Sequence, residues 1–478
     1  MNFITYDIIL LAIFVLFVAI FLYRHRKNLK REGLLLLYKT SVGVRIIDKI
    51  GKKYKKILNI LGWVSIGLGF LLMLAMLYLF GKMVWLYIFQ SELIQLVKIP
   101  PITPLLPYLP QIFKLDFLPP FYFIYWIVII AIVAIVHEFS HGIFAANKGV
   151  KIKSTGFGFF PFFLPVFLAA FVELDEKKMA KKKISSQMAV LSAGTFANLL
   201  TAILFFGVLT LFFSLSFTPS GVIFDTYTYS PVQTSSISAI NSISVHNATY
   251  TQIFDIVNDS GKATSIIYTS NGVKYLINPS FLEQQKTADE YLLLYDDSAA
   301  IRANLSNIIM KVNGVTINNK EQLGKELLKY APGTKITVTA LTDDADEDYE
   351  IILGENPGDK SRAYLGVGFM NRESSGILGK VMAVLTSFKD SGVYYKPNFQ
   401  AAEFIYNWIW WLVLICFSVA LINMLPVGIF DGGRFFFLMM LALTKSKDKA
   451  KKIFKAVTYL FLFLLGVIMV FWAINFFR

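Results

Sequence analysis

In the stretch Ile132-Val-Ala-Ile-Val-His137-Glu138-Phe-Ser-His141-Gly-Ile-Phe144, three ionisable side chains directly follow an apolar segment. On a helix, residues four apart lie on the same face, so His137 and His141 can present two imidazoles to one metal ion. Glu138 lies about 100° further round the helix and can reach a water molecule on that metal. This HExxH spacing is typical of two zinc ligands and a general base, so we predict a metal site here. Two other interpretations are a buried polar cluster between helices and a proton relay.

The composition places this motif in a membrane. Hydrophobic residues make up 55% of the chain and charged residues 16%, against about 25% in soluble proteins. This excludes a purely soluble enzyme, and the single cysteine, Cys416, excludes a disulfide scaffold. A helix needs about 20 mostly apolar residues to cross a bilayer. Six segments qualify and predict a polytopic α-helical membrane protein: Phe3–Tyr23, Leu58–Phe89, Phe121–Ala146, Met188–Phe213, Phe404–Leu425 and Ile453–Phe477.

The distribution of charge predicts which side of the membrane each loop faces. Lys and Arg crowd residues 24–56, 148–183 and 445–455, and basic loops are normally cytoplasmic. Residues 217–398 hold 15 basic and 20 acidic residues, so the net charge of +14 comes from the segments beside the spans. We therefore expect contact with the lipid bilayer and no nucleic acid. Both termini and residues 217–398 would lie outside the cell, with the active site near the cytoplasmic side of a prokaryotic plasma membrane.

A catalytic zinc ion usually has three protein ligands, so a third must come from elsewhere in the chain. His25 lies in a charged loop and His246 in the polar segment, so both are remote from the motif. The fifth span ends in Asn423-Met-Leu-Pro-Val-Gly-Ile-Phe-Asp431-Gly-Gly, where proline and glycine break the helix. His137 is about 24 Å into its span at 1.5 Å per residue, and Asp431 also comes near the inner surface. Asp431 is the candidate third ligand; the alternative is a plain turn that closes a helix.

The polar segment contains an internal repeat with an offset of 72 residues. Residues 237–245 match residues 309–317, and each copy predicts a strand, an Asn turn, a short strand, a helix and a further strand. The second copy resembles a PDZ domain in its Val312-Asn-Gly turn, its 321–328 helix and Pro332-Gly. That resemblance implies two α+β modules that bind extended chain ends at a sheet edge. The alternative is a pair of modules that only caps the membrane part.

The HEFSH and NxxPxxxFDGG motifs together resemble the site-2 protease family of intramembrane zinc metalloproteases, which also carry a PDZ-like insertion between them. The resemblance covers residues 121–215 and 400–440. It implies that His137, His141 and Asp431 bind one Zn²⁺ and that Glu138 is the catalytic base. Phe430 replaces the usual Leu, and the segment 194–198 lacks a proline that is common there but keeps its Asn.

Three further expectations concern the mechanism, and the resemblance implies the first of them. Asn198 and Asn423 would donate hydrogen bonds to the substrate backbone or the oxyanion, unless they only join neighbouring helices. Residues 154–172 are apolar but interrupted by Gly and Pro, and predict either a re-entrant β-hairpin or an interfacial loop. A hairpin would offer a strand edge to an unwound substrate helix, and cleavage would release a cytoplasmic fragment.

We expect five regions with distinct roles. They are N-terminal transmembrane helices in 1–120, the first half of the catalytic core in 121–216, PDZ-like modules in 217–290 and 291–398, and the second half of the core in 399–478. The predicted function is cleavage of peptide bonds within or near transmembrane helices of membrane proteins already trimmed by another protease. A non-hydrolytic membrane scaffold and a metal or proton transporter are the competing hypotheses.

Overall fold

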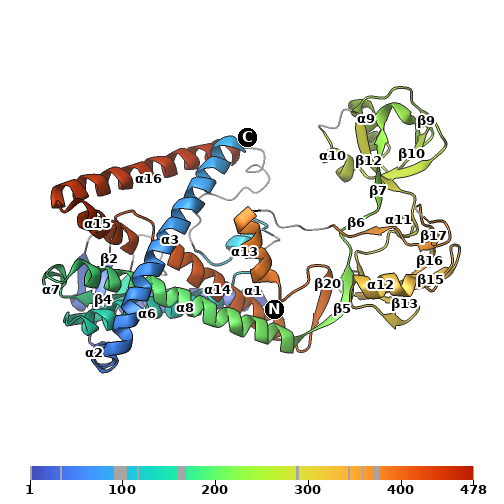
Figure 1. Cartoon of the computed structure of the whole chain (residues 1–478). Helices are drawn as coiled ribbons and strands as arrows, with labels where there is room; N and C mark the ends of the chain where they lie inside the picture. The colour runs from blue at the N-terminus through green and yellow to red at the C-terminus, as the bar shows by residue number, and fades with distance from the viewer. Residues whose placement is uncertain are drawn as a thin grey trace. The chain divides into compact units, whose positions relative to one another are not determined.

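The chain folds into two compact units, shown in Figure 1. The computed structural model describes residues 3–32, 35–90, 105–115, 118–159, 168–286, 290–342, 345–357, 359–370 and 376–476. The membrane unit comprises residues 1–213 and 403–478, and the insert comprises residues 214–402. The predicted polar segment 217–398 falls within the insert.

Six helices in the described residues are long and apolar enough to cross a membrane, which confirms the predicted number of spans. Their bounds differ from the predicted ones by a few residues, because polar residues extend several helices beyond their apolar windows. They are α1 (Phe3–Arg24), α3 (Lys55–Phe89), α6 (Phe123–Asn147), α8 (Ile184–Ser216), α14 (Ala402–Ile422) and α16 (Lys447–Phe476). Shorter helices are α2 (Val44–Lys53), α5 (Leu109–Ile112), α7 (Glu176–Ala180) and α15 (Asp431–Thr444).

The centre of the membrane unit is the α6 helix, which is packed on several sides. Trp126 and Ile129 of α6 are fully buried in one cluster with Leu412 of α14. At its start, α6 is capped by a residue from another helix. Both oxygens of Asp7 in α1 accept hydrogen bonds from backbone N–H groups of α6, those of Phe123 at 2.7 Å and Ile124 at 3.0 Å. An apolar helix with its free N–H groups satisfied in this way is held in a defined position.

A four-stranded antiparallel sheet also belongs to the membrane unit. It consists, in order, of β1 (Leu29–Glu32), β2 (Leu35–Thr40), β3 (Ile152–Phe159) and β4 (Leu168–Leu174). The β3–β4 pair falls in the segment predicted as a hairpin, whose middle, residues 160–167, lies outside the described residues. The first two strands come from the segment expected only to be a basic loop. Lys39 and Glu173 form an ion pair of 2.8 Å across this sheet.

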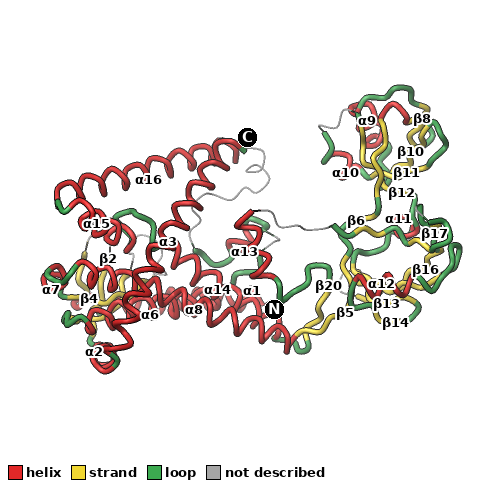
Figure 2. The backbone as a smooth tube through the Cα atoms, in the orientation of Figure 1, coloured by secondary structure: helices red, strands yellow, loops and turns green. Residues whose placement is uncertain are grey.

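The insert contains two larger sheets, which appear as separate groups of strands in Figure 2. One has the order β7-β12-β11-β10-β8-β9, and the other has the order β16-β15-β13-β5-β20 with β14 beside β13. The strands of the first are β7 (Tyr229–Gln233), β8 (Ile237–Ile240), β9 (Ile243–Ser244), β10 (Ser265–Thr269), β11 (Lys274–Ile277) and β12 (Tyr291–Asp296). Those of the second are β5 (Phe217–Ile223), β13 (Ile308–Val312), β14 (Val315–Thr316), β15 (Lys335–Thr342), β16 (Ala345–Ile352) and β20 (Val393–Pro397). Two-stranded pairs join β6 (Thr226–Tyr227) to β19 (Val367–Gly368) and β17 (Gly354–Glu355) to β18 (Ala363–Tyr364).

The sheets divide the insert differently from the predicted modules 217–290 and 291–398. Strand β5 pairs with β13 and β20, so it belongs to the second sheet although it precedes the first in the chain. Strand β12 pairs with β7 and β11, so it belongs to the first sheet. The first module is thus inserted between β5 and β13 of the second. The order follows from long-range strand pairing, which a local repeat does not reveal.

The two sheets nevertheless share a repeated unit, as the sequence repeat predicts. Asn241 and Asn313 both have a left-handed backbone, with φ of 56° and 46°. The Oδ1 atom of each accepts a hydrogen bond from the strand paired with the one before the turn, Asn241 from Ile266 N–H of β10 at 3.0 Å and Asn313 from Thr337 N–H of β15 at 2.8 Å. The helices α9 (Tyr250–Asp259) and α12 (Lys320–Leu327) follow these turns. Remaining helices of the insert are α10 (Pro279–Glu283), α11 (Ala299–Arg302) and α13 (Gly376–Thr386).

Candidate metal centre

His137 and His141 lie one turn apart in the second half of α6, and both are buried. Their Nε2 atoms are 3.1 Å apart. Two unprotonated imidazole nitrogens repel each other at that distance, because each carries a lone pair. A proton or a metal cation between them removes the repulsion.

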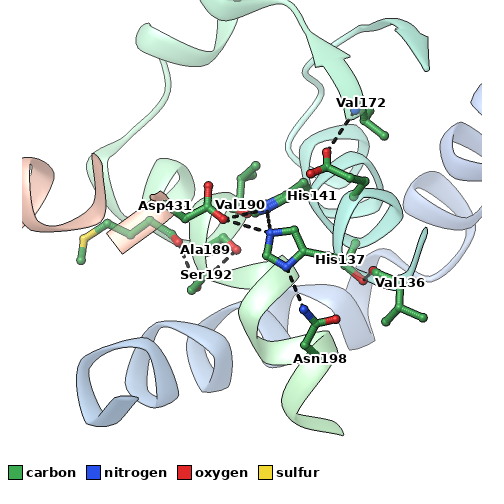
Figure 3. A network of polar contacts seen from close by, with 12 residues as sticks. Val136, His137, His141, Val172, Ala189, Val190, Ser192, Asn198 and Asp431 are labelled. Carbon is green, nitrogen blue, oxygen red and sulfur yellow. Dashed lines mark hydrogen bonds and ion pairs between the residues drawn. The ribbon is translucent and has the colours of Figure 1, made fainter. Parts of the chain in front are cut away.

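Asp431 reaches the two imidazoles from the first residue of α15. Its Oδ2 atom is 3.1 Å from Nε2 of His137 and 3.1 Å from Nε2 of His141. In Figure 3 the three side chains point toward one another from two separate segments of the chain. Nearly 300 residues of sequence separate Asp431 from the histidines, and the fold closes that separation.

The two glycines that follow Asp431 let α15 start where it does. The N–H of Gly432 donates a hydrogen bond of 2.7 Å to the carbonyl oxygen of Asn423 at the end of α14. A Cβ atom on Gly432 would lie 2.3 Å from the backbone carbon of Met424, and one on Gly433 would lie 2.3 Å from the carbonyl oxygen of Val427. Backbone packs directly on backbone here, so the Asp-Gly-Gly sequence sets the position of the carboxylate.

The donor set fits a zinc ion. The three atoms form a triangle with sides of 3.1 Å. In a tetrahedral site with zinc–ligand bonds of about 2.0–2.1 Å, neighbouring ligand atoms lie about 3.3–3.4 Å apart. Two imidazoles and one carboxylate are the nitrogen and oxygen ligands of a catalytic zinc site, which leaves a fourth position for water. These residues, the one such group found in the described part of the chain, would therefore hold a single Zn²⁺.

The outer nitrogens of both imidazoles also have partners. Nδ1 of His141 lies 2.7 Å from the carbonyl oxygen of Val190, to which it donates, so Nε2 is left as the ligand atom. Nδ1 of His137 lies 3.1 Å from the side-chain nitrogen of Asn198, while the buried Oδ1 of Asn198 has no partner in the structure. Exchanging the amide oxygen and nitrogen lets Oδ1 accept from the Nδ1–H group and leaves Nε2 free for a metal. An orphaned oxygen beside this ring thus supports the metal assignment.

Helix α8 approaches the imidazoles so closely that only glycine fits at one position. A Cβ atom on Gly194 would lie 2.5 Å from Nε2 of His141 and 2.7 Å from Nδ1 of His137. Asn198 lies one turn further along the same helix and is fully buried. Helix α8 therefore packs directly against both imidazoles of the candidate metal site.

Glu138 lies next to His137 in the sequence but makes a different contact. Its Oε2 atom accepts a hydrogen bond of 3.1 Å from the backbone N–H of Val172 in β4. Strand β4 is the last strand in the sheet order, so alternate backbone N–H groups of this strand point away from β3, and the one of Val172 donates to Glu138. The contact fixes one carboxylate oxygen of Glu138 and leaves the other for chemistry.

The structure brings together most of the residues that the sequence singled out. His137, His141 and Asp431 form a group that could hold a metal ion, and Asn198 contacts one of them rather than facing open space. The backbone oxygen of Asn423 supports α15, and no described residue forms a hydrogen bond with its side-chain amide. Gly194 was not recognised as a site residue. The sequence feature that could have indicated it is the Gly-Thr-Phe-Ala-Asn motif of residues 194–198, in which the functional prediction concerns only Asn198.

Comparison with known proteins agrees with this geometry. An uncharacterized protein, MJ0971, of Methanocaldococcus jannaschii is 31% identical over 202 residues, which is 42% of this chain and 50% of that protein. The chain thus matches about half the length of this relative. The model of peptidase family M50 matches residues 125–465, a range that contains both the HExxH helix and Asp431. The chain therefore belongs to peptidase family M50, the site-2 protease family.

Proposed function

We propose that this protein is an intramembrane zinc metalloprotease that hydrolyses peptide bonds within or near transmembrane helices of other membrane proteins. The observation that carries the proposal is the meeting of His137, His141 and Asp431, whose ligand atoms lie 3.1 Å apart in a unit built from membrane-spanning helices. Zinc bound there would activate a water molecule and polarise the scissile carbonyl group.

Glu138 would act as the general base and then the general acid. It would take a proton from the attacking water and pass it to the departing amine. The hydrogen bond from Val172 to Oε2 holds the carboxylate in place, and Oε1 would be the atom that carries the proton. Because Val172 belongs to β4, this hydrogen bond connects the sheet directly to the proposed base.

The two asparagines would have different roles. Asn198 is fully buried against His137, which favours a positioning role for that imidazole over contact with the substrate. Asn423 is half-buried at the end of α14, and its amide would donate to the substrate backbone or the oxyanion. The alternative for Asn423 is a purely structural amide between helices.

An unwound substrate segment would pair with the outer edge of β4. A helical substrate hides its amide groups in its own hydrogen bonds, so it must become extended before attack. Strand β4 is the last in the sheet order and contacts Glu138 through Val172. A substrate strand added beside the residues that precede Val172 would thus lie close to the base.

The insert would select substrates. Its two repeated units would act as PDZ-like modules outside the cell and admit only membrane proteins shortened by an earlier protease. We place the active site near the cytoplasmic side of a prokaryotic plasma membrane, on the basis of the basic loops. Deleting residues 220–398 is expected to abolish the discrimination between full-length and trimmed substrates. Unchanged discrimination would remove this role.

The central test compares the full-length protein with its Glu138→Gln variant in detergent. Both are expected to contain one zinc ion per chain, and only the native protein is expected to cleave a model transmembrane peptide. Asp431→Ala is expected to lose zinc as well as cleavage. Equal cleavage by the native protein and the Gln variant would refute the assigned base. Metal uptake without any cleavage would favour a transporter or a scaffold.

A further inference from the structure

A cavity of about 390 Å³ lies in the membrane unit between α7, α8, α15 and the start of α16, and neither His137 nor His141 is among the residues that line it. Figure 1 shows α7, α15 and the beginnings of α8 and α16 at the same end of the unit. The volume falls in the range of about 300–1,000 Å³ that is common for small-molecule sites. No part of the proposed proteolytic chemistry uses it.

One side of this cavity is strongly basic. Lys447, Lys451 and Lys455 line it from α16, and their spacing of four residues puts all three on one face of the helix. Within the described residues, no carboxylate lies within 4.0 Å of these three ammonium groups. Three like charges on one face repel one another, so an anion bound between them would be stabilised.

A fourth cation in the lining is already paired. Arg434 of α15 forms a bidentate ion pair with Glu176 of α7, at 3.2 and 2.9 Å. Because Arg434 is engaged in this pair, the three lysines are the cations of the lining that remain available to a ligand. The lining contains no Asp or Glu, so the electrostatic field inside it is positive.

The other side of the cavity is apolar. Met179, Leu191 and Leu438 are buried, and Phe437 packs edge-to-face on Phe454 with ring centroids 6.2 Å apart. Free inorganic phosphate gains nothing from such a surface, whereas an amphiphile fills both halves. The cavity lies at the first turns of α8 and α16, where charged residues give way to the apolar spans. In helices that cross a bilayer, such a boundary between charged and apolar residues falls at the depth of the lipid headgroups.

We propose that this cavity binds an anionic phospholipid, with the headgroup phosphate on Lys447, Lys451 and Lys455 and the start of an acyl chain on the apolar side. The lipid would join α16 to α15, the helix that begins with Asp431. The proposal concerns binding, and it stands whether or not the protein cleaves peptides.

The test is native mass spectrometry of the full-length protein in detergent, with phosphatidylglycerol and phosphatidylcholine of equal chain length. Phosphatidylglycerol is expected to be retained in preference to phosphatidylcholine. The triple variant Lys447→Gln/Lys451→Gln/Lys455→Gln is expected to lose that preference. A lysine near an anionic lipid contributes about fivefold in affinity, so the triple loss is on the order of 100-fold. The matched control carries the same Lys→Gln change at Lys445, Lys449 and Lys452, which belong to the same segment but do not line the cavity.

Each outcome decides the proposal. The proposal is supported if the control and a triple Arg variant retain phosphatidylglycerol and only the Gln variant loses it. Equal loss in the control shows non-specific attraction and overturns it, as does unchanged retention in the Gln variant. Displacement of the lipid by millimolar inorganic phosphate would assign the cavity to soluble phosphate instead of lipid. Zinc content and elution volume of each variant establish that the fold is intact.

Discussion

Replacing Gly194 with Ala should disrupt the metal centre although no proposed ligand residue is changed. The added Cβ would lie 2.5 Å from Nε2 of His141 and 2.7 Å from Cε1 and Nδ1 of His137. Ordinary contacts of a Cβ atom begin at 3.4 Å, so the imidazole of His141 or helix α8 must move by about 0.9 Å. Metal–ligand distances tolerate about 0.2 Å, so the donor triangle cannot survive this shift unchanged.

We expect the dissociation constant for zinc to rise by about 10- to 100-fold in Gly194→Ala. Cleavage of a model transmembrane peptide at saturating zinc should fall by about 100-fold, since a misplacement near 1 Å costs that much in rate. Zinc affinity would be measured by competition with a coloured chelator on the full-length protein in detergent. Circular dichroism would establish that helix content is retained.

The matched control is Gly207→Ala in the same helix. A Cβ atom at position 207 meets nothing within 4 Å, so this variant should bind zinc and cleave like the native protein. Native zinc affinity and native cleavage in Gly194→Ala would show that α8 does not pack directly against both imidazoles. Equal damage in both variants would indicate a general effect of alanine on α8 and would also refute the reasoning.

Three other predictions concern two further residues of the metal centre and one ion pair of the insert. Gly432→Ala should displace Asp431 and lower zinc content, whereas Gly466→Ala, which meets open space, should not; equal zinc content in the two would contradict the backbone-packing argument. Asn198→Ala should weaken zinc binding by about 10- to 100-fold. Asn198→Asp keeps an acceptor oxygen and should retain most of the native zinc affinity. A loss of cleavage with unchanged zinc affinity would instead support contact between Asn198 and the substrate. In the insert, burial raises the pKa of Asp297, but hydrogen bonds from Arg302 and Lys274 outweigh burial and hold that pKa below its usual value. The stabilisation that this carboxylate provides is therefore present above pH ~4 and is lost as the pH falls further. Asp297→Asn should speed hydrogen exchange of β11 and β12 at pH 7 but make little difference at low pH. The control is Asp255→Asn, which changes an exposed carboxylate.

The sequence alone was enough for the features that depend on local pattern. Apolar length predicted six spans, because a helix in lipid must satisfy its own backbone groups and be long enough to cross. The four-residue spacing of His137 and His141 predicted a shared ligand face, because helix geometry is independent of context. The polar, broken end of the fifth span pointed to Asp431, and the repeated Asn turns predicted the duplicated unit of the insert.

Only the tertiary structure decided the features that depend on pairing between distant segments. Strand β2 pairs with β3, which lies more than 100 residues later in the chain. Strand β5 pairs with β13, although an entire module lies between them in the sequence. The local sequence predicts neither register. The roles of Gly194 and Asn198 depend on how closely α8 packs against α6, a distance that a motif does not encode. Periodicity shows which face of an element is apolar, but the close-packed interior alone decides which partner that face meets.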